Sequence, residues 1–220
     1  MTSCRYSNQI RYQITPADYS ALRARLASAA PEETGESVHM LLFASYRRYM
    51  LPGQVEEEPE EDRTEPVFSL RYFDNDPTYL LLERQQDGET EAAMVTEAEC
   101  RALLDGETDW LLDSRNPLLQ DFHDGLTRRM LLPRVLLSYR RETYALEGRD
   151  LWVSLDTGIR ASLQHMDFLD PELLARDTEG QEERMLMEIS YSSAVPDELL
   201  CLLEETAPRR RLLRGHGLPA

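Results

Sequence analysis

The sequence predicts an α+β chain with mainly antiparallel strands, an arrangement that a β-tunnel with inserted and flanking helices would satisfy. Strand-length apolar runs recur along the chain, turn-forming segments separate them, and a few capped helical segments lie between. With 220 residues, 41% of them hydrophobic, the chain can bury the core of one domain.

The first third of the chain predicts a strand, a helix and three further strands. Residues 10–14 form the first strand, Thr15 then caps a helix that starts at Pro16, and Pro31 ends that helix. Residues 38–43 are an apolar run of strand length. Residues 67–73 and 78–84 form a hairpin, because the intervening residues 74–77 (DNDP) have the composition of a turn.

The remaining elements are predicted in the same way. Residues 96–99 (TEAE) form a capping box that opens a short helix, and Asn116 with Pro117 opens another, which we expect Pro133 to end. Strands follow at 134–144, 151–156 and 185–191, and Pro196 opens a last helix. We assign residues 1–208 to one domain and residues 209–220 to a basic tail that frays.

The charge balance excludes several functions. The chain has 24 basic and 41 acidic residues, a net charge of −17, and all its basic residues are Arg. Without Lys there is no Walker A lysine and no Schiff-base lysine. An acidic chain is also a poor ligand for nucleic acid polymers or an anionic membrane surface, and no apolar run is long enough for membrane insertion.

Residues 54–66 (QVEEEPEEDRTEP) form a markedly acidic segment with seven acidic residues and one Arg. We expect a solvated loop inserted in the domain, since such a charge run with two prolines does not pack. Binding of an unidentified protein partner is the alternative.

The cysteines and the N-terminus indicate a cytoplasmic protein. Cys4, Cys100 and Cys201 are scattered without CxxC spacing, which is typical of a reducing compartment and argues against a zinc site. The first residues lack the apolar region of a secretory signal.

Alternation along the predicted strands places arginines and carboxylates on one face. That face carries Gln9 and Arg11, Ser69 and Arg71, Tyr79 and Glu83, Tyr139 and Arg141, Ser154 and Asp156, and Glu188 and Ser190. Arg forks bind phosphate oxygens and carboxylates hold Mg²⁺ or Mn²⁺, so the face could hold a phosphate chain with a metal. A buried ion-pair network, or outward-facing charges, is the alternative.

The stretch from Ser69 to Glu83 resembles the VTC domain, the polyphosphate-polymerase module of the vacuolar transporter chaperone family. Further blocks continue the resemblance in the same order, at 96–106, 109–112, 116–119, 132–141, 153–160, 167–170 and 187–191. The resemblance implies a triphosphate-tunnel (CYTH-like) fold. It also implies transfer of a nucleotide's γ-phosphoryl group to polyphosphate with Mn²⁺ or Mg²⁺.

The resemblance also implies the site residues. Arg71, Arg141 and Arg160 would be catalytic, the same three with Arg11 would bind phosphate, and Glu83, Asp156 and Glu188 would hold the metal. The sequence departs from the family where basic residues or an acid are expected, at Gln9, Val67, Ser69, Gln85, Thr90 and Ser190, and Arg11 replaces a Lys. Since each lost charge-assisted contact is worth about 1.5–3 kcal/mol, these departures predict much weaker phosphate binding.

Three hypotheses follow. The first is a VTC-like pseudoenzyme with weakened or lost catalysis that binds polyphosphate, triphosphate or a nucleotide. The second is an active metal-dependent polyphosphate polymerase or triphosphatase. The third is a non-enzymatic interaction module that acts through its acidic surface. The sequence leaves open whether catalysis survives.

Overall fold

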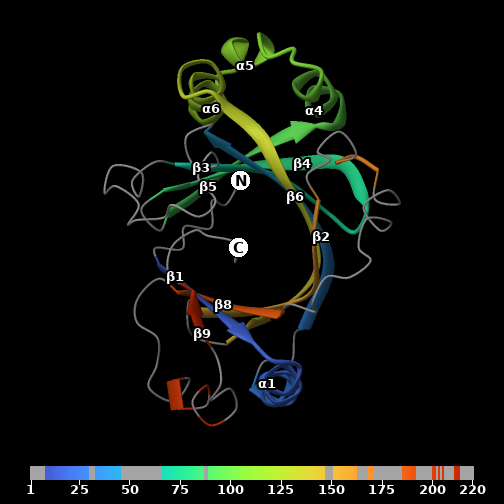
Figure 1. Ribbon diagram of the computed structural model, residues 1–220, viewed down its shortest axis with the longest axis vertical. Helices are drawn as coiled ribbons and strands as arrows, with labels where there is room; N and C mark the ends of the chain where they lie inside the picture. The colour runs from blue at the N-terminus through green and yellow to red at the C-terminus, as the bar shows by residue number, and fades with distance from the viewer. Residues whose placement is uncertain are drawn as a thin grey trace. The chain divides into compact units, whose positions relative to one another are not determined.

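The computed structural model describes residues 8–29, 33–45, 66–86, 89–146, 151–162, 168–170, 185–191, 200, 201, 203, 205 and 211–213. Its strands, labelled in Figure 1, are β1 (Asn8–Ile14), β2 (Glu33–Ser45), β3 (Val67–Phe73), β4 (Asp76–Gln86), β5 (Glu89–Thr96), β6 (Leu131–Ala145), β7 (Leu151–Ser162), β8 (Met185–Tyr191) and β9 (Arg211–Leu213). Its helices are α1 (Pro16–Ala29), α4 (Glu97–Leu104), α5 (Trp110–Asp113) and α6 (Pro117–Arg128).

These strands form one sheet in the order β5-β4-β3-β2-β6-β7-β8-β1-β9. The registered pairs β1–β8, β1–β9, β2–β3, β3–β4, β4–β5 and β7–β8 are all antiparallel. The predicted α+β class with an antiparallel sheet is therefore confirmed. By its contacts the chain divides into two compact units, and each is described by itself.

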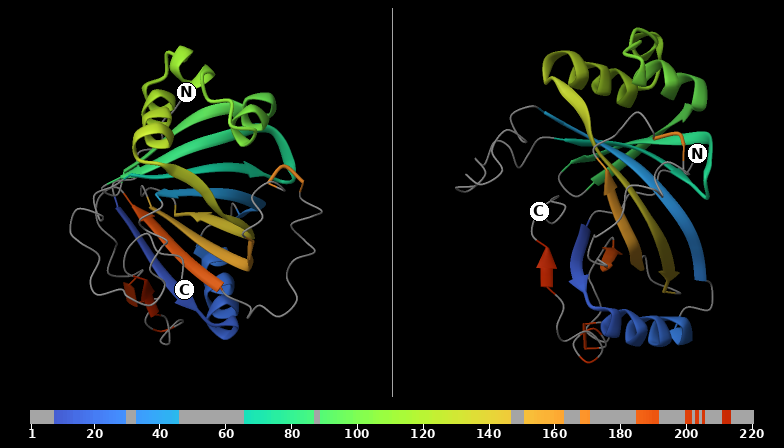
Figure 2. Two further views of the ribbon diagram at one scale, coloured as in Figure 1. Left: turned by 45° about the horizontal axis from the view of Figure 1, so that its top comes forward. Right: turned by 45° about the vertical axis from the view of Figure 1, so that its right-hand side comes forward.

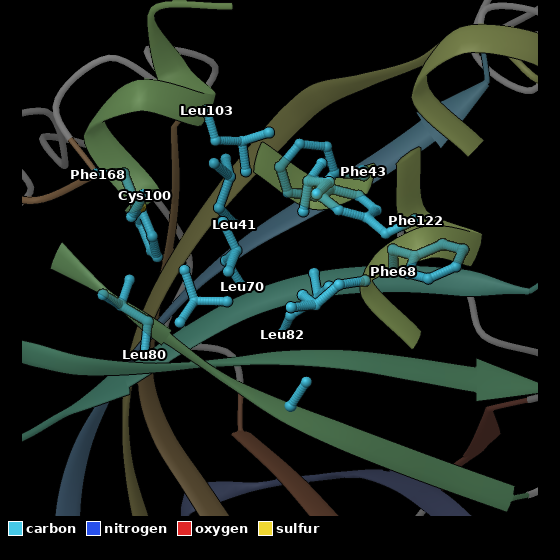
Figure 3. Close-up of a cluster of buried hydrophobic side chains, with 14 of the residues drawn as sticks. Leu41, Phe43, Phe68, Leu70, Leu80, Leu82, Cys100, Leu103, Phe122 and Phe168 are labelled. Carbon is cyan, nitrogen blue, oxygen red and sulfur yellow. The ribbon is translucent and has the colours of Figure 1, made fainter. Parts of the chain in front are cut away.

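The first unit comprises residues 1–4, 38–137 and 161–179. Helices α4, α5 and α6 gather on one face of the β3–β4–β5 strands, as both views of Figure 2 show. The apolar side chains of that face pack with the helices into one core, drawn in Figure 3. Leu70, Leu80, Leu82, Phe68 and Phe122 are all fully buried there, each contributing about 1.5–3 kcal/mol by burial.

The second unit comprises residues 5–37, 138–160 and 180–220. Helix α1 begins as predicted: the Asp18 backbone N–H donates to Thr15 Oγ1 at 3.2 Å, and the Thr15 hydroxyl donates back to the Asp18 carboxylate at 2.7 Å. Leu22 and Leu26 of this helix pack with Val153 and Met187 in a second core. One face of these strands therefore packs against α1, and the opposite face carries the polar side chains.

The β3–β4 hairpin has a tighter turn than the sequence indicated. Asp74 and Asn75 form a two-residue turn with φ angles of 52° and 58°. Two successive left-handed residues match the twist of an antiparallel hairpin, and Asp and Asn tolerate this conformation.

Three predicted details differ from the structure. Helix α6 ends at Arg128 rather than at Pro133, which lies within β6, because Met130 takes a left-handed conformation (φ 55°) just after the helix. Strand β5 was not predicted, although the sequence Asp87–Gly88 before it is a hairpin signal. Arg211–Leu213, expected to fray, instead pair with β1.

Two other predictions fall outside the described residues. The acidic segment 54–66 does so except for Pro66, and so do most of the helix expected from Pro196 and the other residues of the 209–220 tail. Among the described residues, no helix has the length and apolar character needed to cross a membrane.

Candidate functional site

In the second unit, the strand register lines up the polar residues that the sequence analysis placed on one face. Arg11 of β1 lies opposite Glu188 of β8, and Glu188 lies opposite Ser154 of β7. Alternate residues such as Val153 and Met187 point into the core. Register and alternation thus assemble the polar row, because antiparallel partners share a face.

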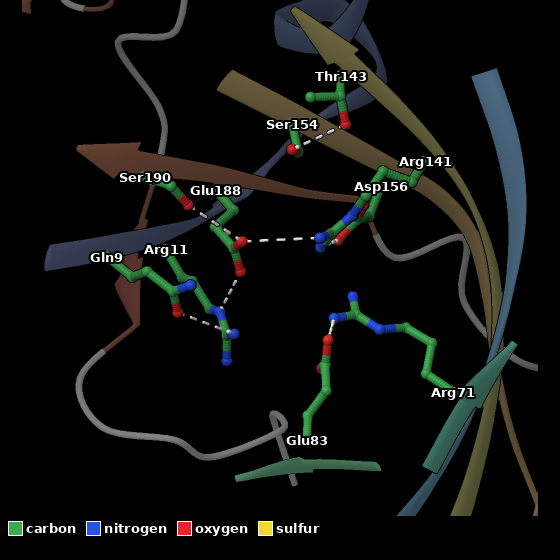
Figure 4. Close-up of polar contacts among 10 residues, drawn as sticks. All are labelled: Gln9, Arg11, Arg71, Glu83, Arg141, Thr143, Ser154, Asp156, Glu188 and Ser190. Carbon is green, nitrogen blue, oxygen red and sulfur yellow. Dashed lines mark hydrogen bonds and ion pairs between the residues drawn. The ribbon is translucent and has the colours of Figure 1, made fainter. Parts of the chain in front are cut away.

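Glu188 lies between two guanidinium groups. Arg11 Nε donates to Glu188 Oε2 at 2.6 Å, and Arg141 Nη1 of β6 lies 3.6 Å from Glu188 Oε1 (Figure 4). Ser190 Oγ donates to the same Oε1 at 3.5 Å. The Glu188 side chain is only 8% exposed, so its charge depends on these neighbours for stabilisation.

Arg141 also forms a bidentate pair with Asp156 of β7. Its Nε and Nη2 donate to the two carboxylate oxygens at 2.7 Å each. Burial by itself would lower the pKa of Arg141, but Asp156, Tyr139 and Glu188 raise it well above its ordinary value. The Arg141 guanidinium therefore stays charged in the site and has a fixed orientation.

The four ionic side chains of this group sum to zero charge, two guanidinium groups against the carboxylates of Asp156 and Glu188. Neutral polar groups surround them. Thr143 Oγ1 and Ser154 Oγ lie 3.2 Å apart, and the Gln9 amide oxygen accepts a long hydrogen bond of 3.5 Å from Arg11 Nη2. The group is an ion-pair network with hydroxyl and amide neighbours, which is the alternative that the sequence analysis kept open.

Arg71 and Glu83 form a second ion pair, within the first unit. The two lie on adjacent strands β3 and β4, and their side chains are 16% and 12% exposed. The Arg71 guanidinium also lies over the Phe73 ring, 5.5 Å from its centroid. This arginine is thus neutralised in the same way as Arg11 and Arg141.

Arg160 differs from the other expected phosphate ligands. It lies near the end of β7 with its side chain exposed, and it makes no hydrogen bond or ion pair in the described part of the chain. The structure brings Arg11, Arg141, Asp156 and Glu188 together in the second unit but does not join Arg160 to them.

The carboxylates expected to hold a metal are already paired with arginines. Mg²⁺ and Mn²⁺ need several oxygen ligands that face the ion directly. Both oxygens of Asp156 accept from Arg141, and Glu188 lies between two arginines. Over the described ranges, no group of three or more Asp, Glu, His or Cys side chains could hold an ion. In this paired arrangement Glu83, Asp156 and Glu188 do not fit a divalent cation, so their metal role stays a prediction.

Comparison with family models matches residues 80–210, more than half of the chain, to the VTC domain. The chain belongs to the VTC domain family. The resemblance found in the sequence is thereby confirmed, and Glu83, Arg141, Asp156 and Glu188 lie within the matched residues.

Two solved structures show how far the likeness to other proteins extends. A putative adenylyl cyclase from Hippeastrum, HpAC1, described as having a dominant triphosphatase activity, is 14% identical, with a TM-score of 0.48 over 90% of this chain and 84% of that one. A putative adenylate cyclase from Bacillus halodurans is 12% identical, with a TM-score of 0.48 over 91% and 87%. The comparison with curated proteins gave no match.

Two buried polar groups of this VTC domain were not found from the sequence. Glu142 accepts hydrogen bonds from Tyr19 Oη, Arg23 Nε and Tyr144 Oη at 3.0–3.1 Å and so ties α1 to β6. His39, stacked on Tyr72, shares a 2.6 Å hydrogen bond with Asn75 Oδ1. Glu142 lies on the core side of β6, next to Arg141 on the polar face. The sequence signal for it was a charged residue at a position where the alternation of the strand predicts an apolar one.

Proposed function

We propose that this VTC domain binds a short phosphate-containing anion through Arg11 and Arg141, with polyphosphate-polymerase or triphosphatase chemistry weakened or lost. The observation that carries the proposal is the convergence of two guanidinium groups, from β1 and β6, on the single carboxylate of Glu188. Family membership supports a polyphosphate- or triphosphate-related function.

Guanidinium groups suit this ligand class. Arg offers planar, paired N–H donors that match phosphate oxygens, and it stays charged at any working pH. The raised pKa of Arg141 keeps this group charged, and its two bonds to Asp156 orient it with Nη1 toward the position of the Glu188 carboxylate. Ser154, Ser190 and Thr143 add hydroxyl donors on the neighbouring strands.

Charge supports weakened rather than full activity. Arg11 and Arg141 are each paired with a carboxylate, so an entering anion meets a neutral group of described side chains rather than a basic surface. Neutral residues stand at Gln9, Ser69, Gln85, Thr90 and Ser190, where the resemblance implies an acid at the first and Lys or other basic residues at the rest. The net charge of −17 further disfavours a polyanion.

Calorimetric titration of sodium triphosphate into the full chain tests the binding step. We expect saturable binding that Arg11→Gln weakens roughly tenfold, because one charge-assisted contact is lost. Arg11 is partly exposed, so this variant should fold normally. Arg101→Gln on α4 is the matched control, since it removes the same charge from an exposed pair. No binding heat for the unmodified chain would refute the proposal.

Turnover assays decide between weakened and full activity. The chain is incubated with triphosphate, or with ATP, in the presence of Mn²⁺ or Mg²⁺, and phosphate release and chain growth are followed. We expect little or no turnover at concentrations that saturate binding. Rapid release that Arg141→Lys abolishes would instead favour the active polymerase or triphosphatase.

A further inference from the structure

Glu188 is positioned where a ligand anion would have to bind. Its two carboxylate oxygens face different arginines, Oε2 toward Arg11 Nε at 2.6 Å and Oε1 toward Arg141 Nη1 at 3.6 Å. Figure 4 shows the carboxylate between the two guanidinium groups. The remaining N–H pair of Arg141 is already used by Asp156.

We infer that Glu188 is an internal competitor, a carboxylate that occupies the anion position between Arg11 and Arg141 and sets the affinity of this chain for phosphate ligands. The inference rests on the proposed function, because it assumes that these two arginines are the phosphate ligands. It gives Glu188 a role opposite to the metal-binding role that the resemblance implies.

The contacts support competition over cation binding. A cation next to Glu188 would also lie next to two guanidinium groups and be repelled by both. An anion would instead replace the carboxylate and meet the same donors. Asp156 does not compete in this way, because its two short bonds to one edge of Arg141 orient that group and leave Nη1 toward Glu188.

Displacement of Glu188 has a consequence for ligand choice. Once an anion occupies the arginines, the Glu188 carboxylate is left in a poorly solvated position and loses its two guanidinium contacts, which costs free energy. Only an anion with several charges and several acceptor oxygens regains enough by binding to both arginines. The site therefore selects triphosphate over inorganic phosphate.

Glu188→Gln tests the inference, since it keeps the size of the side chain and removes its charge. Sodium triphosphate and inorganic phosphate are titrated into the full chain and the variant in EDTA, and the titrations are repeated with Mn²⁺ in place of EDTA. We expect the variant to bind triphosphate roughly tenfold more tightly, or better, because no carboxylate has to be displaced. The affinity should also fall more steeply with salt, since the arginine pair gains uncompensated charge.

Two further variants complete the experiment. Glu97→Gln, in the exposed pair with Arg101 on α4, changes the net charge equally and should leave the affinity unchanged. Arg11→Gln added to Glu188→Gln should remove the gain. Should Glu188→Gln not fold, Glu188→Asp, which retracts the carboxylate by one methylene, should show a smaller gain in the same direction.

The outcomes separate this inference from the proposed function. Triphosphate binding by the unmodified chain that Glu188→Gln leaves equal or weakens would overturn the inference and leave the function standing. If Glu188→Gln weakened triphosphate binding only when Mn²⁺ is present, the inference would be overturned and Glu188 would be assigned to a metal instead. Failure of both proteins to bind would overturn the function and the inference together.

Discussion

Asp156 receives two parallel hydrogen bonds from Arg141, through Nε and Nη2, each 2.7 Å long. Asp156 lies on β7 and its side chain is 7% exposed, and Arg141 lies on the neighbouring strand β6 with its side chain 14% exposed. A bidentate pair at this depth fixes the direction of the guanidinium group. The stability of the folded chain also depends on this pair, because neither buried charge has enough water around it to replace its partner.

Asp156→Asn should lower the free energy of unfolding by about 3 kcal/mol, the lower part of the range for removing one partner of a buried pair. Arg141 would keep its charge but, among the described residues, retain only the longer ion pair with Glu188 and its contact with the Tyr139 ring. Urea unfolding followed by circular dichroism measures the loss. The double variant Asp156→Asn with Arg141→Gln should lose less than the sum of the single variants; additive losses would show that the two groups do not depend on each other.

Glu142→Gln should destabilise the chain by about 2 kcal/mol, because the amide cannot accept from all three donors that surround the carboxylate. Helix α1 should lose protection first, since Tyr19 and Arg23 belong to it. Hydrogen exchange of the α1 amides measures this. Arg23→Gln is the comparison and should cost less, because Arg23 is half exposed; an equal cost would contradict the central role of Glu142.

Met130→Gly should raise the free energy of unfolding by about 0.5–1 kcal/mol. Met130 has a φ of 55° and is 61% exposed, so glycine relieves the left-handed conformation and loses little packing. Thermal unfolding compares it with Met130→Ala, which keeps the Cβ and should not stabilise. Equal stabilisation by both variants would mean that removal of an exposed thioether, not backbone relief, is responsible.

His39 should make stability depend on pH. Burial lowers its pKa from 6.5, while the hydrogen bond with Asn75 only partly opposes this. Because the folded state binds its proton less readily, the stabilisation is complete above pH 6.5 and declines as the pH falls toward the lowered pKa. The limiting slope is about 1.4 kcal/mol per pH unit for one proton.

Urea unfolding between roughly pH 7 and pH 5 measures this slope, above the range in which most carboxylates titrate. His39→Gln, which retains an N–H donor for Asn75, should flatten it. The His39 Nδ1 is buried and accepts no hydrogen bond from any described residue, so protonation there would bury an unpaired donor. An unchanged slope in the variant would assign the dependence to other groups.

Local signals were sufficient for most elements. Thr15 with Pro16, the capping box at Thr96 and Glu99, and Asn116 with Pro117 all begin helices where predicted, because capping uses only neighbouring residues. The end of α6, in contrast to its start, was not set by a capping signal in neighbouring residues. The chain leaves the helix at Met130, a residue with no intrinsic preference for a left-handed conformation, where the following residues enter β6.

The sequence by itself determined the class of the fold, the family and which residue types share the polar face, since alternation and motif order are written in the chain. Only the tertiary structure decided how those residues pair. Arg11 and Glu188 are 177 positions apart, and their contact follows from strand register and side-chain direction. In the described part of the chain the charges of Arg11, Arg141, Asp156 and Glu188 consequently balance, because each buried charge needs a partner where burial removes its water.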